Sequence, residues 1–203
     1  MTRAAPVTLV LASGSAGRLG LLRHAGIEPE VVVSGVDETC DESLDTPAMV
    51  AILAERKASA VASLRPDALV LGCDSLLDFE GQPLGKPATP DEAVAGWRKV
   101  AGREGMLCTG HCLIEGRTGR RVREVAATIV RFGTPTEAEL TAYVASGEPR
   151  SLAGGFSIDG RGAPFVDGID GDPGTVIGLS LPLLRRMLAG LGIAITDLWA
   201  PLG

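Results

Sequence analysis

The chain has 203 residues, of which 45% are hydrophobic and only 3% aromatic, and its formal net charge is −6 at pH 7. We expect residues 1–203 to form a single domain with an aliphatic core. The acidic balance argues against a nucleic-acid partner, which usually selects a basic surface. No apolar run approaches the roughly 18 residues of a membrane span, and the first residues lack a signal-peptide pattern, so we expect a cytoplasmic protein without a membrane partner.

The first predicted elements are a strand at 7–11, a loop of small residues and a helix. Unpaired backbone N–H groups and the positive end of the helix dipole favour an anion at the start of such a helix. Ser13 and Ser15 add hydroxyl donors, and Arg18 adds a planar guanidinium group that suits phosphate. An N-cap serine beside a surface arginine explains less of this pattern, so an anion site is the preferred interpretation. The glycine spacing matches neither a Walker A loop nor a Rossmann fingerprint.

A second strand is predicted around Val31–Val33, and four acidic residues follow within 37–42. Such acids usually belong to a solvated loop or a helix start, but past a strand end they can also serve a metal ion or a base. A helix is then predicted from an N-cap at Thr46 to about residue 64. Lys57 lies in the apolar stripe of this helix, so its side chain either extends to water or meets an anion inside the protein.

The apolar run Leu69–Leu71 predicts a strand that is buried on both faces. It places Asp74 at the carboxyl end of the strand, where ligands bind in open α/β sheets. Turn residues at 79–83 predict a hairpin, after which Lys86 returns towards the same end. A carboxylate beside a cation on rigid strands suits a phosphate and a metal ion. A strand-capping aspartate and a solvated lysine are the alternative, and these two residues alone leave the choice open.

The rest of the chain predicts further helices and strands and a glycine-rich segment. In chain order, these are a helix at 91–101, strands at 106–114 and 122–132 joined by a hairpin, a helix from a Thr136–Glu139 capping box to about 146, ordered glycine-rich turns at 153–178, and a helix from 181 to about 191. Glycine-rich turns allow the backbone to approach a ligand closely. The four cysteines lack zinc-ligand spacing, so we interpret them as buried free thiols.

Short motifs from Leu9 to about Leu191 resemble, in order, those of the Maf family of nucleoside triphosphate pyrophosphatases. The similar elements are Leu11-Ala12-Ser13-Gly14-Ser15-Ala16-Gly17-Arg18, Asp37-Glu38, Lys57-Ala58, Gly72-Cys73-Asp74-Ser75, Gly85-Lys86-Pro87, Thr109-Gly110, Ala153-Gly154-Gly155, Gly160-Arg161-Gly162-Ala163 and Val176-Ile177-Gly178-Leu179. Their ordered agreement is specific, although no element is decisive alone. The chain differs from the family pattern at Gly17, where the family has the first of two arginines, at Ser75, where it has threonine, and at Asp159, where many members have glutamine.

The resemblance implies an α/β fold in which helices flank an elongated mixed sheet, with two lobes and a central cleft, similar to inosine triphosphatase. It also implies a housecleaning hydrolase that converts a nucleoside triphosphate, standard, modified or non-standard, to the monophosphate and pyrophosphate. Water would attack the α-phosphorus with help from Mg²⁺ or Mn²⁺. A homodimer is a further expectation from the family.

The resemblance also assigns roles to the candidate residues. Asp74 is expected to be the general base, directly or through water on the metal ion, and Asp74 and Glu38 are the expected metal ligands. Asp159 is expected to face the nucleobase or the reacting end of the substrate. The residues expected to bind the triphosphate are Ser13, Ser15, Arg18, Lys57 and Lys86.

Two other functions fit the same anion site. The first is a non-catalytic nucleotide-binding regulator of cell division. The presence of both carboxylates favours the enzyme, because a sensor has no need to keep them. The second is a phosphatase for sugar phosphates, which would need no pocket for a nucleobase. The preferred base stays open.

Overall fold

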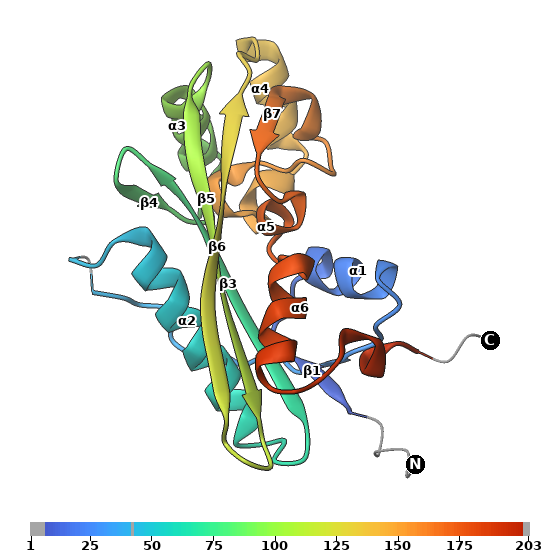
Figure 1. The fold of residues 1–203 in the computed structure, drawn as a ribbon. Coiled ribbons are helices and arrows are strands. Elements are labelled where there is room, and N and C mark those ends of the chain that lie inside the picture. Colours follow the sequence, from blue (N-terminus) through green and yellow to red (C-terminus); the bar gives the residue numbers. More distant parts are fainter. Residues whose placement is uncertain (1–6, 42, 201–203) are drawn as a thin grey trace.

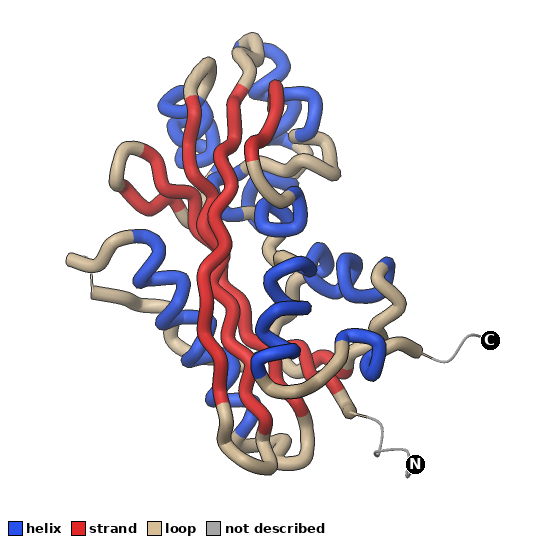
Figure 2. The backbone as a smooth tube through the Cα atoms, in the orientation of Figure 1, coloured by secondary structure: helices blue, strands red, loops and turns tan. Residues whose placement is uncertain are grey.

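The computed structural model describes residues 7–41 and 43–200, which form a mixed α/β fold around a seven-stranded sheet flanked by helices (Figure 1, Figure 2). The strands lie in the order β2-β1-β3-β5-β6-β7, and β4 pairs with β3. They are β1 (Leu9–Leu11), β2 (Glu30–Val31), β3 (Leu69–Phe79), β4 (Gln82–Leu84), β5 (Glu104–Glu115), β6 (Arg121–Phe132) and β7 (Val166–Asp170). The pairs β1–β2 and β1–β3 are parallel, and the other pairs are antiparallel.

Six α-helices and four short 3₁₀ helices occur in the described ranges. The α-helices are α1 (Ala16–His24), α2 (Thr46–Ala62), α3 (Pro90–Val100), α4 (Glu137–Ala145), α5 (Pro173–Ile177) and α6 (Leu181–Gly190). The 3₁₀ helices are η1 (Glu148–Ser151), η2 (Ala153–Gly155), η3 (Ala163–Phe165) and η4 (Ile195–Leu198). None of the helices in residues 7–41 and 43–200 has the length and apolarity that a membrane crossing requires.

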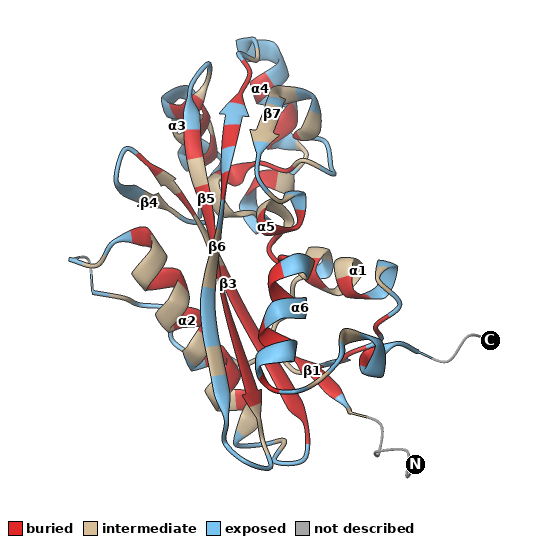
Figure 3. Cartoon of the chain, in the orientation of Figure 1, coloured by how far each residue is buried: buried red, intermediate tan, exposed pale blue. Residues whose placement is uncertain are grey.

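The long strands β3, β5 and β6 connect two regions of buried side chains (Figure 3). At one end, Leu69 and Leu71 of β3 face the cluster that contains α6, while Val70 faces the cluster that contains α2. This alternation follows from the period of two in a strand. At the other end, α3 and α4 pack around Trp97, which makes edge-to-face contacts with three aromatic rings. The expected two lobes therefore correspond to two core regions on shared strands.

Helix α2 lies unusually close to the sheet because two glycines face it. A Cβ atom on Gly72 of β3 would lie 2.3 Å from the carbonyl oxygen of Ala54. A Cβ atom on Gly110 of β5 would lie 2.1 Å from the carbonyl oxygen of Val50. Both distances are impossible for a side chain, so glycine at these positions allows the helix backbone to rest on the strands.

The predicted elements outside 153–178 are confirmed in kind, with differences at three boundaries. The prediction of turns alone at 153–178 is wrong, because Val166–Asp170 pairs with β6 as strand β7 and Pro173–Ile177 forms helix α5. Asp74 lies in the middle of β3 and not at a strand end, because pairing with β5 continues to Asp78. The N-cap of α2 is Asp45 and not Thr46, since the Asp45 carboxylate accepts from the N–H of Ala48. The second strand is limited to Glu30–Val31, where it pairs with β1.

Other local predictions are confirmed in detail. Thr136 and Glu139 form the expected capping box at α4. Cys73, Cys108 and Cys112 are buried free thiols, and Cys40 is a half-buried one. The acidic segment 37–41 is a loop, and Glu42, its last acid, lies outside the described residues.

Candidate functional site

The site forms at a break in the sheet, on one edge of β3. The pairing of β1 with β3 ends at Leu71, and the pairing of β4 with β3 begins at Leu77 on the same edge. Residues 72–76 are paired with β5 on the opposite edge only, within the described part of the chain. The carboxyl ends of β1 and β4 both point into this gap, so the segments that follow them meet beside Asp74. Asp74 therefore lies beside the ends of two strands, although it is itself in the middle of β3.

Lys57 connects two carboxylates inside the gap. Its Nζ atom lies 2.6 Å from Oδ1 of Asp74 and 2.7 Å from Oε1 of Glu38. The side chains of Lys57 and Asp74 are about one-tenth exposed or less, whereas 58% of the Glu38 side chain is exposed. The stripe lysine of α2 therefore meets an anion inside the protein, as the second of the two sequence interpretations requires.

The charge of this cluster affects Glu38. Partial burial by itself raises the pKa of the Glu38 carboxyl, but the hydrogen bond and charge of Lys57 outweigh it. The charges of Lys86 and Arg18 act in the same direction, so the pKa of Glu38 lies below its ordinary value. Four groups from α1, α2, the acidic loop and the segment after β4 thus share one electrostatic neighbourhood.

Arg18 is buried and is held by three acceptors, one in the loop just before its helix and two on distant parts of the chain. Its Nη1 donates to Ser13 Oγ at 3.0 Å, its Nη2 to Ser75 Oγ at 3.0 Å, and its Nε to the carbonyl of Gly178 at 2.8 Å. Within the described residues, these three bonds use three of the five N–H donors of the guanidinium group. Two donors therefore remain for an anion. The alternative interpretation, a surface arginine beside an N-cap serine, is wrong for the arginine, since only 9% of Arg18 is exposed.

The two serines of the first loop have different roles. Ser15 is the N-cap of α1, and its Oγ accepts from the N–H of Arg18. Ser13 Oγ accepts from the N–H of Ser15 at 3.2 Å as well as from Arg18. Gly17, which follows, has a Cβ position only 3.0 Å from the side chain of Ile177. A Cβ atom at position 17 would require the Ile177 side chain to shift by a few tenths of an ångström.

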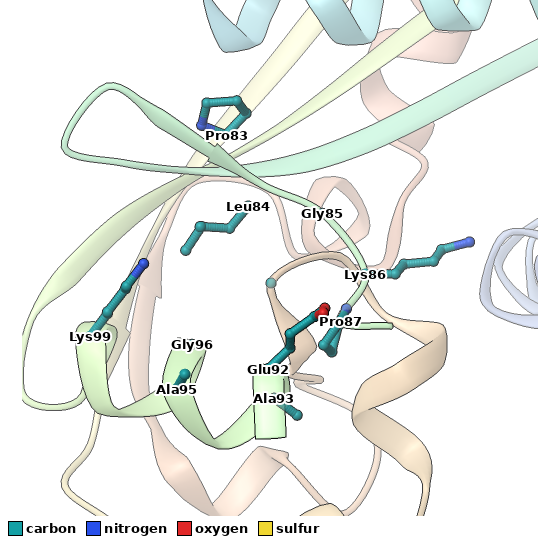
Figure 4. Close-up of a pocket in the computed structure, with 11 residues that line it drawn as sticks. Pro83, Leu84, Gly85, Lys86, Pro87, Glu92, Ala93, Ala95, Gly96 and Lys99 are labelled. Atoms are coloured by element: carbon teal, nitrogen blue, oxygen red, sulfur yellow. The ribbon is translucent and has the colours of Figure 1, made fainter. Parts of the chain in front are cut away.

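Lys86 extends from the segment that follows β4. Figure 4 shows its side chain pointing away from the other residues that line a cavity of about 270 Å³ between this segment and α3. Lys86 is exposed, and its charge acts on Glu38. The cavity therefore lies behind the segment, while the ammonium group belongs to the charged cluster.

In the described part of the chain, Asp159 makes no hydrogen bond or ion pair with this network. It is exposed, in a turn of the glycine-rich segment. Glu148 holds that turn, because its carboxylate accepts from the N–H groups of Arg161 and Gly162 and from Ser157 Oγ at 2.6 Å. Its role at a nucleobase stays a prediction.

Sequence reasoning missed the polar chain behind the gap. Ser75 Oγ lies 2.9 Å from Thr109 Oγ1, which donates to the carbonyl of Thr175 at 2.8 Å. Both threonines are fully buried. In the sequence, Ser75 stands out only because it differs from the threonine of the family pattern. Its position directly after Asp74 in the strand is the signal that could have indicated a role at the site. Adjacent residues of a strand face opposite sides of a sheet, so Asp74 meets Lys57 and Ser75 meets Arg18.

A divalent cation has two protein carboxylates available here. Within residues 7–41 and 43–200, no group of three or more His, Cys, Asp or Glu side chains is arranged to hold a metal ion. Mg²⁺, however, commonly uses one or two carboxylates and takes its other oxygen ligands from water and substrate phosphates. Asp74 and Glu38, which converge on Lys57, fit a site in which two carboxylates hold the ion and water and phosphate oxygens complete its ligands.

Comparisons with known proteins agree on one family. The model of the Maf-like protein family matches residues 8–191. A protein of Streptomyces coelicolor named "Nucleoside triphosphate pyrophosphatase" is 61% identical over 197 residues, which cover 95% of each chain. Proteins with the same name from Salinispora tropica and Mycobacterium sp. (strain JLS) are 51% and 52% identical, over 98% and 94% of this chain and 91% and 97% of theirs.

A solved structure, "The structure of the Staphylococcus aureus Ham1 protein", is also similar. It is 16% identical, with a TM-score of 0.42, over 62% of this chain and 72% of that chain. A likeness of this degree carries no argument about the site.

Proposed function

This chain belongs to the Maf-like protein family, and from that premise we propose that it hydrolyses a nucleoside triphosphate to the nucleoside monophosphate and pyrophosphate. The names of relatives at 50–61% identity support this reaction class. The structural observation that carries the proposal is the position of Lys57 between Asp74 and Glu38, beside a buried arginine and the start of a helix. A carboxylate that can act as a base and several cationic side chains therefore face the gap beside Asp74.

In this proposal the triphosphate occupies the gap in the sheet edge. Ser13 and Ser15 with the start of α1 bind it from one side, and Lys86 binds it from the other. Arg18 contributes its two remaining N–H donors and a fixed positive charge. Because its other three donors are held by protein acceptors, the guanidinium group is oriented before the substrate arrives.

Asp74 accepts the proton of the attacking water. The water oxygen forms a bond to the α-phosphorus, and the bond from that phosphorus to the α,β-bridging oxygen breaks. The electron pair leaves with pyrophosphate, and the proton passes to Asp74 and later to solvent. Lys57 fixes the position of the Asp74 carboxylate for this step, while Lys86 and Arg18 offset the charge that grows on the leaving group.

We assign Glu38 and Asp74 as the ligands of Mg²⁺ or Mn²⁺, together with phosphate oxygens. When bound, the cation would lower the charge on the phosphates and the pKa of water at the site. The homodimer and the cytoplasmic location stay predictions. The preferred nucleobase stays open.

The test is pyrophosphate release from a panel of standard and modified nucleoside triphosphates, with and without Mg²⁺ or Mn²⁺. We expect metal-dependent release from one subset, which also identifies the base. Tight nucleotide binding without release from any member would refute the enzyme and support a nucleotide-binding regulator. Faster phosphate release from sugar phosphates than from any nucleotide would support the phosphatase instead.

A further inference from the structure

In the described part of the chain, hydrogen bonds on both sides of Lys86 hold the segment that carries it. Ahead of the lysine, the carbonyl of Gly85 accepts from the N–H of Gly154 at 2.9 Å. Beyond it, the N–H of Ala88 donates to Glu92 Oε2 at 2.8 Å. Between these two bonds the segment forms one wall of the 270 Å³ cavity, and α3 forms the opposite wall (Figure 4). Lys86 therefore lies on a segment that has the cavity, and not packed side chains, on its other side.

A residue of α3, in the centre of the aromatic core, bonds the residue next to Gly154. The indole Nε1 of Trp97 donates to the carbonyl of Gly155 at 2.9 Å. Trp97 itself is 1% exposed, and three aromatic rings surround it. A buried donor thus holds the carbonyl of Gly155, one residue beyond the N–H that bonds Gly85.

The backbone at this place cannot hold its shape unaided. Gly154 and Gly155 have φ values of 68° and 70°, in the left-handed region that few residues adopt, and such glycines are conformationally free when unfolded. A Cβ atom on Gly154 would lie 2.8 Å from the side chain of Leu77, so a stiffer residue is excluded. The N–H of Gly155 donates to the carbonyl of Leu152 at 3.0 Å within the turn, and the bonds to Gly85 and from Trp97 add order from outside it.

We propose that Trp97 is a positioning residue for substrate binding, which acts through Gly155 and Gly154 to hold Lys86 at the triphosphate. The inference rests on the proposed function, because it takes Lys86 as a phosphate ligand. Trp97 never touches the substrate. Its indole N–H reduces the number of conformations open to the Lys86 segment, so less conformational entropy is lost when phosphate binds.

The first test is a double-mutant cycle on the full chain, with calorimetric binding of inorganic pyrophosphate in the presence of Mg²⁺. Trp97→Phe keeps an aromatic ring but removes the donor. We expect it to weaken pyrophosphate binding and raise KM by about three- to tenfold, with kcat changed by less than about twofold. In the Lys86→Ala background, Trp97→Phe should have no further effect on affinity, because the group it positions is absent.

The matched control is Trp199→Phe, which alters the second of the two tryptophans, at an exposed position in the described structure. It should leave affinity and both kinetic constants unchanged. Wild-type affinity in Trp97→Phe would overturn the inference. It would also be overturned if the double variant lost as much affinity as the two single variants together. Failure of the wild-type protein to release pyrophosphate would instead refute the proposed function.

The second test uses the unaltered core, so it holds even where Trp97→Phe does not fold. Coupling between two sites is reciprocal: if Trp97 helps Lys86 bind phosphate, phosphate must stabilise the Trp97 bond. Solvent exchange of the Trp97 indole proton, followed by NMR and assigned with Trp199→Phe, should slow when pyrophosphate binds. The slowing should be absent in Lys86→Ala. Exchange that pyrophosphate leaves unchanged in the wild-type protein would overturn the inference.

Discussion

The Nζ atom of Lys57 lies 2.6 Å from Oδ1 of Asp74, across the contact between α2 and the centre of the sheet. This distance depends on Gly72 and Gly110, which let the helix backbone rest on β3 and β5. With side chains at those positions the helix would move outward and the ion pair would separate. The close packing at the two glycines is therefore a condition for the Lys57–Asp74 ion pair.

Removing the ammonium group should destabilise the protein. Lys57→Met leaves the Asp74 carboxylate buried without its partner, which we expect to lower the free energy of unfolding by about 3 kcal/mol. Lys57→Met combined with Asp74→Asn removes both charges and should recover most of that loss, without recovering activity. Urea unfolding measures the stabilities. Equal stability of the single and double variants would contradict a buried, mutually dependent pair.

Asp74→Asn should reduce kcat by at least about 100-fold, because an amide cannot accept the proton of water. Pyrophosphate affinity should remain measurable. Asp78→Asn is the matched control on the same strand, since that carboxylate bonds Thr46 Oγ1 and the N–H of Gly81. Near-wild-type turnover by Asp74→Asn would exclude this residue as the base.

Lys86→Ala should act mainly on affinity. We expect KM for the triphosphate to rise about tenfold or more, which corresponds to the loss of one charge-assisted contact, with a smaller change in kcat. The control is Lys99→Ala, because Lys99 is an exposed lysine of α3 that faces the cavity from its other side. If both variants behaved like the wild-type protein in steady-state kinetics, Lys86 would have no part in phosphate binding.

His111 should make stability depend on pH. Its ring is fully buried; Nε2 accepts from the N–H of Ser180 at 2.9 Å, so the proton is on Nδ1, facing the Thr109 carbonyl. Burial and then the charge of Arg18 lower its pKa from 6.5 to about 4. Between these values the unfolded chain binds the proton and the folded chain does not. Stability is thus fully present above pH 6.5 and falls as the pH drops towards 4.

The loss over that window should reach about 3 kcal/mol at most. Urea unfolding from pH 7.5 to 4.5 measures it. His111→Gln offers an amide oxygen to Ser180 and has no proton to bind, so its stability should decline less steeply over the same range. Parallel pH profiles for the two proteins would rule out His111 as the source.

Much of the fold and part of the site follow from local sequence. Hydrophobic periodicity, caps and turn residues gave the helices and the long strands, because these signals act within a few residues. The position of Lys57 in an apolar stripe was enough to require water or a buried anion, since a desolvated ammonium group cannot stay unpaired. The family followed from motifs in order along the chain.

Only the tertiary structure decided how those motifs meet. The gap beside Asp74 exists because β1 and β4, from different parts of the chain, stop on the same edge of β3. Arg18 finds its acceptor at Gly178, 160 positions away. Such pairings depend on which strands lie side by side and how closely α2 approaches them. Local propensity carries no information about either, because both are set by the packing of the whole chain.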